Sequence, residues 1–274
     1  MSQYAHPNVL VDTQWLMEHL NDPMVRIIEL DMTPELYHIP GAVYWNIFTD
    51  LMRPDLSMNL EPDTIGTLLS RSGISSETTV IGYGSSVCTG AILFWLLRMF
   101  GHDNVYVLDG GYQKWIAEDR PLVTEFSNFA PTQYEVPTPD PSLRVVQPEV
   151  QASLNRSDCV LLDVRTVPEF QGEVFMEKPP EGAECGGHIP GAINVDYTQT
   201  LRDDETFKSY EELHNFFVSQ GITTDKEVFP YCAVGGRSAF IWFVLKYLLG
   251  YPKVRNYDGS WNEWGRLPDV PIEQ

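Results

Sequence analysis

Short apolar segments alternate along the chain with longer segments of helical periodicity. The apolar segments are bounded by turn residues, which is typical of buried strands. We predict strands at Val25–Leu30, Thr79–Tyr83, Val105–Leu108, Val160–Val164, Val228–Tyr231 and Val254–Asn256. We predict helices at Thr64–Arg71, Gly90–Phe100, Tyr210–Val218 and Ser238–Leu249. Strands that alternate with helices predict an α/β fold, in which helices cover both faces of a parallel sheet.

The second half of the chain repeats the first. Three short motifs recur in the same order, and one pair has an offset of 188 − 38 = 150 residues, whereas an earlier pair has 161 − 27 = 134. The matched pairs are Ile27–Asp31 with Leu161–Arg165, His38–Ala42 with His188–Ala192, and Val107–Trp115 with Asn256–Trp264. Repetition in constant order predicts two tandem domains, each with the same α/β architecture.

The repeat and the proline content set the expected domain boundaries. The segment 126–142 holds Pro131, Pro137, Pro139 and Pro141 and has few apolar residues, as an extended linker does. We therefore expect domain one at residues 1–125, a linker at 126–142 and domain two at 143–274. The change of offset gives the second copy 150 − 134 = 16 extra residues, which lie within Thr166–Gly187. This excess is either a cap over a site or a surface loop.

Composition narrows the classes of function. Among 274 residues, 18 Lys and Arg stand against 38 Asp and Glu, a net charge of −20. This charge disfavours binding to nucleic acids and to anionic membranes. The longest apolar runs are too short to span a bilayer, and the beginning of the sequence does not resemble a secretory signal. The four cysteines form no CxxC pair, so we expect neither a disulfide scaffold nor a metal site, and we expect a cytoplasmic protein.

One loop carries the candidate chemistry. Ligands of parallel sheets bind where strands turn into helices, which directs attention to Gly84–Gly90 and Cys232–Ser238. Cys232 leaves a predicted strand just before a helix, where backbone N–H groups and the helix dipole favour a thiolate nucleophile. Arg237 could close the loop or pair with an anionic substrate. The alternative is an inert structural cysteine. Domain one has Gly84 at the matching position and is expected to be catalytically silent.

Several other residues have two interpretations each. Asp163 and Arg165 follow a predicted strand, and Arg165 is either a substrate-side cation or a salt-bridge partner that supports the loop. His38 and His188 occur in both copies, including the silent one, which favours a structural role in a turn. We expect Cys88 to be a structural thiol at the start of a helix. Cys185, within the excess segment, is a weaker candidate for a partner of Cys232.

Together these motifs resemble the tandem-domain rhodanese family of sulfurtransferases, most closely its bacterial thiosulfate sulfurtransferase-like subgroup. The resemblance covers nearly the whole chain and rests on Asp163–Arg165, Gly187–Ala192, Cys232–Arg237 and Asn256–Trp264. It implies that Cys232 attacks the outer sulfur of thiosulfate, releases sulfite and passes the sulfur to cyanide or a thiol, small or protein-borne. It also implies no cofactor. The N–H groups of Ala233, Val234, Gly235, Gly236 and Arg237 would stabilise the persulfide.

Three alternatives remain open. Thiosulfate-type loops carry cations after the cysteine, whereas Ala233 and Val234 follow here, so the donor stays open. A 3-mercaptopyruvate sulfurtransferase is one alternative, although its loop type, Cys-Gly-Ser-Gly-Val-Thr, also differs from this one. A cysteine-dependent phosphatase is a second, but its loop is longer than the four residues between Cys232 and Arg237. The third is a non-catalytic scaffold whose domains bind other proteins.

Overall fold

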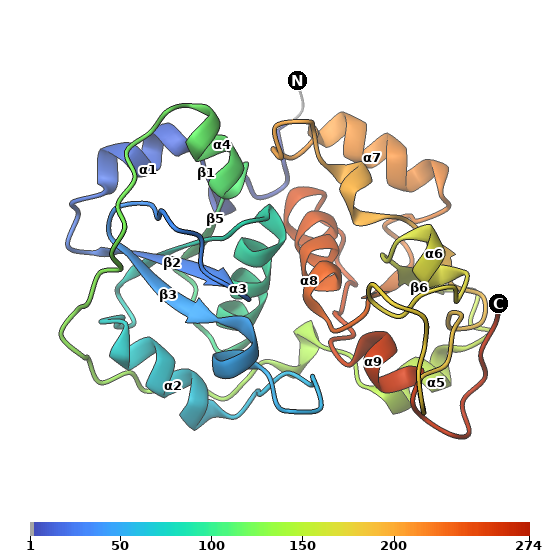
Figure 1. The fold of residues 1–274 in the computed structure, drawn as a ribbon. Coiled ribbons are helices and arrows are strands. Elements are labelled where there is room, and N and C mark those ends of the chain that lie inside the picture. Colours follow the sequence, from blue (N-terminus) through green and yellow to red (C-terminus); the bar gives the residue numbers. More distant parts are fainter. Residues whose placement is uncertain (1–2) are drawn as a thin grey trace.

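The first half of the chain is built on a parallel five-stranded sheet (Figure 1). The computed structural model describes residues 3–274. The strands are β1 (Leu10–Val11), β2 (Val25–Asp31), β3 (Ala42–Asn46), β4 (Thr79–Tyr83) and β5 (Val105–Leu108), in the order β1-β5-β4-β2-β3. The three strands that the sequence predicts here are all present within this sheet.

The second half has a smaller parallel sheet with the same strand order. It consists of β6 (Cys159–Asp163), β7 (Ile193–Asn194) and β8 (Glu227–Tyr231), in the order β7-β6-β8. Isolated parallel bridges continue it from Val228 to Val254 and from Asn256 to Arg144. The first half has β4, β5 and β1 at the corresponding places, so the repeat extends to the topology.

The prediction of a continuous strand at Val254–Asn256 is wrong, because only those isolated bridges form there. Val228 N donates to Lys253 O, Arg255 N to Val228 O and Tyr257 N to Pro230 O. The remaining bond of this parallel pattern would need an N–H at residue 230. Proline has none, so the ladder is interrupted at that point.

Helices cover both faces of each sheet, as predicted. In β2, Ile28 packs with the cluster that includes α2 and α3, while its neighbour Ile27 packs with the cluster of α1 and α4. In the second half, Leu162 and Leu161 divide in the same way between α7 and α8 on one face and α5 and α9 on the other. The helices are α1 (Thr13–His19), α2 (Pro62–Arg71), α3 (Val87–Met99), α4 (Gly111–Ala117), α5 (Gln147–Ser153), α6 (Val167–Phe170), α7 (Tyr210–Ser219), α8 (Gly236–Phe243) and α9 (Ser260–Trp264).

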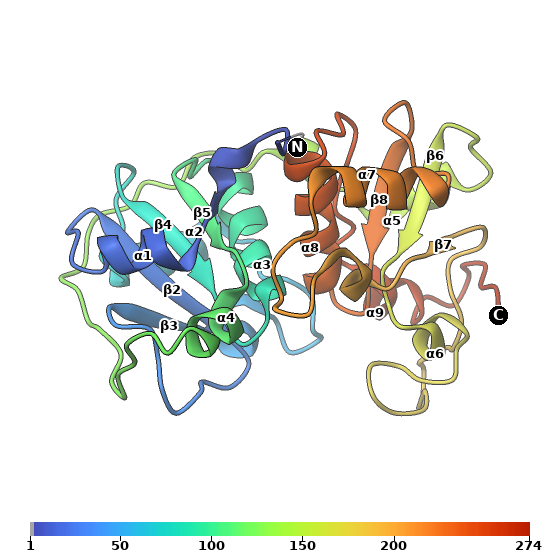
Figure 2. The same ribbon diagram turned by 90° about the horizontal axis from the view of Figure 1, so that it is seen from above.

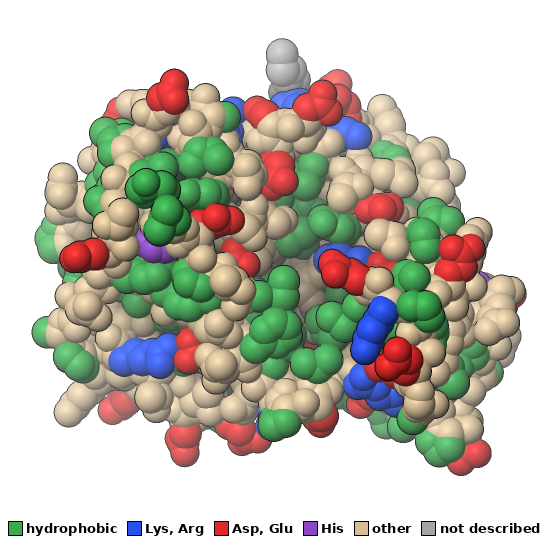
Figure 3. Space-filling view, in the orientation of Figure 1, with side chains coloured by type: hydrophobic (Ala, Val, Ile, Leu, Met, Phe, Trp, Pro, Cys, Tyr) green, Lys and Arg blue, Asp and Glu red, His purple; other side chains and the backbone are tan. Residues whose placement is uncertain are grey.

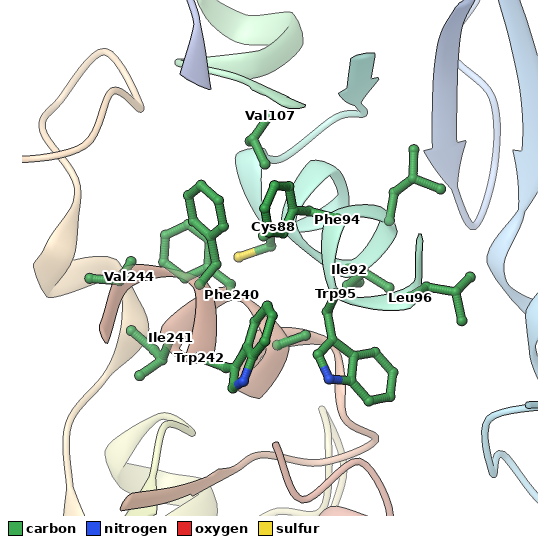
Figure 4. Packing of buried hydrophobic residues seen from close by; sticks show 14 of the residues in the cluster. Cys88, Ile92, Phe94, Trp95, Leu96, Val107, Phe240, Ile241, Trp242 and Val244 are labelled. Carbon is green, nitrogen blue, oxygen red and sulfur yellow. The ribbon is translucent and has the colours of Figure 1, made fainter. Parts of the chain in front are cut away.

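The two halves join through α3 and α8, which lie side by side between the sheets (Figure 2). The Phe94 ring contacts Phe243 at 4.9 Å and Tyr247 at 4.8 Å between centroids. Figure 4 shows how residues of the two helices interdigitate. One buried cluster therefore runs through both halves, so burial of this apolar surface favours a fixed arrangement of the two domains.

The proline-rich segment is extended and packs along the first half. Thr132 N donates to Ser70 O at 2.9 Å, and Tyr134 Oη lies 2.9 Å from His102 Nδ1. The Arg26 guanidinium lies over the Phe129 ring at 3.7 Å. Among residues 3–274, no helix has the length and apolarity needed to cross a membrane, and no three His, Cys, Asp or Glu side chains are grouped to hold a metal ion.

Candidate active site

Cys232 lies directly after β8, and the residue is 1% exposed. Gly235 N donates to Cys232 Sγ at 3.2 Å. Gly235 has φ +91° and precedes the first residue of α8. A Cβ there would lie 2.6 Å from Asp258 O, so only glycine fits this turn. The turn thus aims a backbone N–H and the N-terminal end of α8 at the sulfur, which stabilises negative charge on it.

The segment at the start of α9 fixes the backbone of the cysteine loop. Cys232 N donates to Ser260 Oγ at 3.0 Å, and Trp261 N donates to Cys232 O at 2.9 Å. Ser260 Oγ also lies 3.9 Å from Cys232 Sγ. Ser260 is not among the site residues predicted from the sequence. The repeat contained a signal for it, because the first copy has Gly111 at the matching position.

Arg237, at the start of α8, is paired with Glu169 of α6. Its Nη1 and Nη2 each donate to one carboxylate oxygen at 2.7 Å. Glu169 also accepts from Thr166 N at 3.0 Å and from Thr166 Oγ1 at 2.9 Å. Burial acts to raise the pKa of Glu169, but the bonds from Arg237 outweigh it and leave that pKa below its usual range. Burial likewise opposes the charge of Arg237, and Glu169 outweighs it, so the pKa of Arg237 is raised.

Arg165 and Asp163 lie beneath the loop. Arg165 is 1% exposed, its Nη2 donates to Asp163 Oδ2 at 2.6 Å and to Gly187 O at 2.7 Å, and its guanidinium lies 4.6 Å from the Trp261 ring centroid. This placement fits the support alternative rather than a cation that meets substrate. The two arginines proposed for the site are therefore each paired with a carboxylate.

The corresponding loop of the first half differs at the cysteine position and at one of its amides. A Cβ at Gly84 would collide with Thr89 Oγ1 and Leu30 O, so the position has no room for a side chain. Ser85 N, which matches Ala233 N, donates to Asp31 Oδ2 at 2.7 Å. A carboxylate of the chain thus already occupies an amide of this loop. Cys88 lies in the first turn of α3, and burial raises the pKa of its thiol.

The two repeated histidines lie in equivalent turns. His38 Nδ1 is 3.1 Å from Glu29 Oε2, and His188 Nδ1 is 3.0 Å from Phe170 O. Each ring also stacks on a phenylalanine at 3.6 Å. These contacts fit the turn role that the sequence suggested for both.

The excess segment of the second half packs against α9. Trp261 Nε1 donates to Cys185 O at 2.9 Å, and Cys185 N donates to Gly265 O at 3.0 Å. The Cys185 residue is exposed. Figure 3 shows a hollow between the two halves on the face drawn there. The carboxyl ends of the strands of the second half point to this face, which fits the location of binding sites in parallel sheets.

Comparison with known families identifies this architecture. The family model for the rhodanese-like domain matches residues 12–118 and 146–267. The chain belongs to the rhodanese family. This rhodanese is 44% identical over 278 residues to the "Sulfur carrier protein TtuD" of Thermus thermophilus, with 98% of each chain covered. It is 38% identical over 285 residues to a "Putative thiosulfate sulfurtransferase" of Haloferax volcanii, covering 100% of this chain and 98% of that one.

Solved structures match over the whole of this rhodanese. The anaerobic ergothioneine biosynthesis enzyme of Chlorobium limicola, in complex with trimethyl histidine, has a TM-score of 0.87 and 26% identity. A structure of EanB that contains a cysteine persulfide has a TM-score of 0.88 and 26% identity. Both matches cover 100% of this chain and 72% of the other.

Proposed function

We propose that this rhodanese transfers sulfane sulfur from thiosulfate, or a related donor, through a Cys232 persulfide to a thiophilic acceptor such as cyanide or a thiol. The observation that carries this proposal is the bond from Gly235 N to Cys232 Sγ. The matching loop of the first half has no thiol at Gly84, and its Ser85 amide is bonded to Asp31. The family, and the persulfide named for a structural relative, support the same chemistry.

The reaction consists of two half-reactions. The Cys232 thiolate attacks the outer sulfur of thiosulfate, the sulfur–sulfur bond of the donor breaks, and sulfite leaves with the bonding electrons. The Gly235 N–H and the amino end of α8 then hold the charge of the persulfide. In the second half-reaction the acceptor attacks the terminal sulfur, and Cys232 leaves as the thiolate. Atoms and electrons balance without a cofactor.

A role as a sulfur carrier, which receives sulfur from another persulfide rather than from thiosulfate, is the second candidate. The pairing of Arg237 with Glu169 and of Arg165 with Asp163 supports it, since neither arginine brings uncompensated positive charge to a dianionic donor. The name of the Thermus thermophilus relative points the same way. 3-Mercaptopyruvate, which carries a single negative charge, is a further donor to compare.

Intact-mass and peptide-mapped mass spectrometry test the proposal. The protein is treated separately with thiosulfate, 3-mercaptopyruvate and a small persulfide, and then with cyanide. We expect Cys232 to gain one sulfur atom and to lose it to cyanide, while Cys232→Ser gains none. The donor that loads Cys232 fastest shows whether thiosulfate, 3-mercaptopyruvate or another persulfide is the preferred source of sulfur. If no donor adds sulfur to Cys232, the proposal is wrong and the scaffold alternative stands.

A further inference from the structure

Each half contributes one short hairpin that reaches the other half. The hairpins span 52–58 and 201–207, and the residues that bridge their ends have the same offset, 201 − 52 = 149 and 207 − 58 = 149. The turn of the second hairpin meets α4 of the first half through an ion pair of Asp204. The turn of the first hairpin meets α9 of the second half, where Asn262 Nδ2 donates to Asp55 O at 2.9 Å. Figure 1 shows the two hairpins, one blue and one orange.

Asn262 is buried and is bonded at both ends of its side-chain amide. The residue is 6% exposed. Its Oδ1 accepts from Arg266 Nη1, and Arg266 Nη2 donates to Glu184 Oε1 at 2.9 Å. Because a guanidinium can only donate and the Asp55 carbonyl can only accept, the amide has one satisfied orientation. One side chain therefore joins the first half, and the excess segment that contains Glu184, to the first turn of α9.

The backbone of the same turn orients the Cys232 loop. Trp261 N donates to Cys232 O at 2.9 Å, and Asn262 N donates to Ala233 O at 2.8 Å. In a trans peptide the C=O and N–H groups point in opposite directions. The N–H groups of Ala233 and Val234, which belong to these two peptides, therefore point away from α9. Both are among the amides predicted to stabilise the persulfide.

The first half meets the loop at a second point. A Cβ added to Gly236 would lie 2.9 Å from Ile92 Cδ1, so α3 is in close contact with the first residue of α8. Gly236 follows Gly235, whose N–H donates to Cys232 Sγ. Contacts from the first half thus reach both ends of the loop, through α9 at Ala233 and directly at Gly236.

Gln113, the equivalent of Asn262 in the repeat, bonds within its own half. The two residues have the common offset, 262 − 113 = 149. Gln113 is exposed, and its Nε2 donates to Ser85 O at 3.4 Å. The bond at Asn262 that crosses between the halves therefore belongs to the copy that holds Cys232.

We infer that Asn262 is a positioning residue, through which the first half holds the Cys232 loop in the conformation that stabilises a thiolate. This inference rests on the proposed function. The bond to Asp55 O fixes the first turn of α9, and the N–H groups of that turn fix the carbonyls of the loop. Without the bond to Asp55, the peptides after Cys232 and Ala233 rotate more freely, which lowers the positive potential that the loop amides create at the sulfur.

The rate of Cys232 alkylation by iodoacetamide, a neutral reagent, tests this inference in the full chain without a sulfur donor. Peptide mapping assigns the modification to Cys232. In Asn262→Ala we expect the rate at pH 7 to fall about 3- to 30-fold, as for other couplings between contacting groups. The rate should approach that of the wild type at high pH, where the thiol is ionised in both proteins.

A loss of packing alone would change the rate in the opposite direction. Cys232 is 1% exposed, so a loop that is merely looser should be alkylated faster at every pH. Alkylation of Asn262→Ala that is faster than in the wild type, or unchanged, therefore refutes the positioning role.

Asp55→Ala tests the same bond from the first half and leaves Asn262 in place. The Asp55 carboxylate holds the hairpin turn, because its Oδ1 accepts from Ser57 N at 3.0 Å and from Ser57 Oγ at 2.6 Å. Its removal should free the carbonyl that Asn262 meets and slow alkylation at pH 7 by at least about threefold. The double variant should be no slower than Asn262→Ala, because both changes break one link. Additive effects would overturn the inference.

Two further variants are matched controls. Gln113→Ala truncates the equivalent side chain, and Asp55→Asn removes the charge but keeps an oxygen that can accept from Ser57. Each should stay within about twofold of the wild-type rate, as exposed substitutions usually do. An equal fall in Gln113→Ala would contradict the inference. Thermal unfolding shows which variants fold, and the exposed Asp55 provides the test if Asn262→Ala does not.

Sulfur loading of Cys232 is measured separately by mass spectrometry. If no donor loads the wild type, the proposed function fails while the alkylation profiles still decide on Asn262. If the wild type is loaded, Asn262→Ala should lower the rate constant of loading and leave its dependence on donor concentration within about twofold, because the residue does not meet the donor. A change confined to the concentration dependence would instead assign Asn262 to donor binding and overturn the positioning role.

Discussion

Arg237 and Glu169 form a two-point ion pair in which both nitrogen–oxygen distances are 2.7 Å. Glu169 is 2% exposed in its side chain, and Arg237 is 24% exposed. The pair ties the first turn of α8 to α6. The positive charge of Arg237 is therefore neutralised by a buried carboxylate that lies within the segment Thr166–Gly187.

Arg237→Ala should destabilise the fold more than it alters the thiol. It leaves Glu169 buried and unpaired, which we expect to cost about 2–4 kcal/mol, because broken buried ion pairs are costly. Because the pKa of Glu169 is lowered in the folded state, its ionised form stabilises the fold at pH values above the ordinary carboxyl pKa. This stabilisation is lost as the pH falls through the folded-state pKa. Thermal unfolding at pH 7 should show a lower Tm in Arg237→Ala and partial recovery in Arg237→Ala with Glu169→Gln.

The pH dependence of Cys232 alkylation decides whether Arg237 also acts on the sulfur. If the arginine only holds the loop, the midpoint of the alkylation profile is the same in wild type and Arg237→Ala. A midpoint displaced to higher pH, together with a normal Tm, would contradict the structural role and favour direct electrostatic stabilisation of the thiolate.

Asp109 makes the contact between the domains sensitive to pH. Phe207 N donates to Asp109 Oδ1 at 3.0 Å, and burial raises the pKa of this carboxyl from 3.8 to about 6. The folded state therefore binds the proton more tightly than the unfolded state. The ionisation of Asp109 therefore lowers the stability of the fold. This loss of stability is absent at pH values below the ordinary carboxyl pKa and complete above pH 6, where it is on the order of 2–3 kcal/mol.

Asp109→Asn should remove this penalty and keep the bond, since the amide oxygen can still accept from Phe207 N. We expect a higher Tm than wild type at pH 8 and a difference that shrinks as the pH is lowered toward 4. Asp203→Asn controls for the general effect of one charge fewer on an acidic chain. A gain of equal size at both pH values would show that Asp109 is not the titrating group.

The repeat made the fold predictable from sequence, because each copy could be compared with the other. Comparison of the two copies aligns Gly84 with Cys232 from the sequence alone. The interruption of the strand ladder near Val254 is caused by Pro230. It could be predicted only by knowing which carbonyl group faces residue 230. The pairing of Arg237 with Glu169 joins residues 68 positions apart. The sequence makes both Asp163 and Glu169 possible acidic partners of Arg237, and only the fold shows which carboxylate it meets.

The cysteines should differ sharply in function. Cys232→Ser should abolish thiosulfate:cyanide sulfur transfer with the fold intact, because a serine hydroxyl does not ionise near neutral pH and cannot carry a persulfide. Replacement of Cys88, Cys159 and Cys185 together by serine should retain most of the activity. Turnover in folded Cys232→Ser would disprove the nucleophile. Loss of persulfide formation in the triple variant would assign a role to a second thiol, and single replacement of Cys185 would then identify it.

Installing a thiol at Gly84 should not create a second active site. Its Cβ would collide with Leu30 O, a backbone atom of the neighbouring strand, so Gly84→Cys should destabilise the fold by about 1–3 kcal/mol. The Ser85 amide is already bonded to Asp31, so the loop could not turn it toward an added sulfur. Mass spectrometry after treatment with thiosulfate should find sulfur on Cys232 and none on residue 84. Ser85→Cys, which adds a thiol where a side chain already fits, controls for stability. Sulfur on residue 84 would show that silence depends on the missing thiol alone, and that the loop amides of the first half can still stabilise a persulfide.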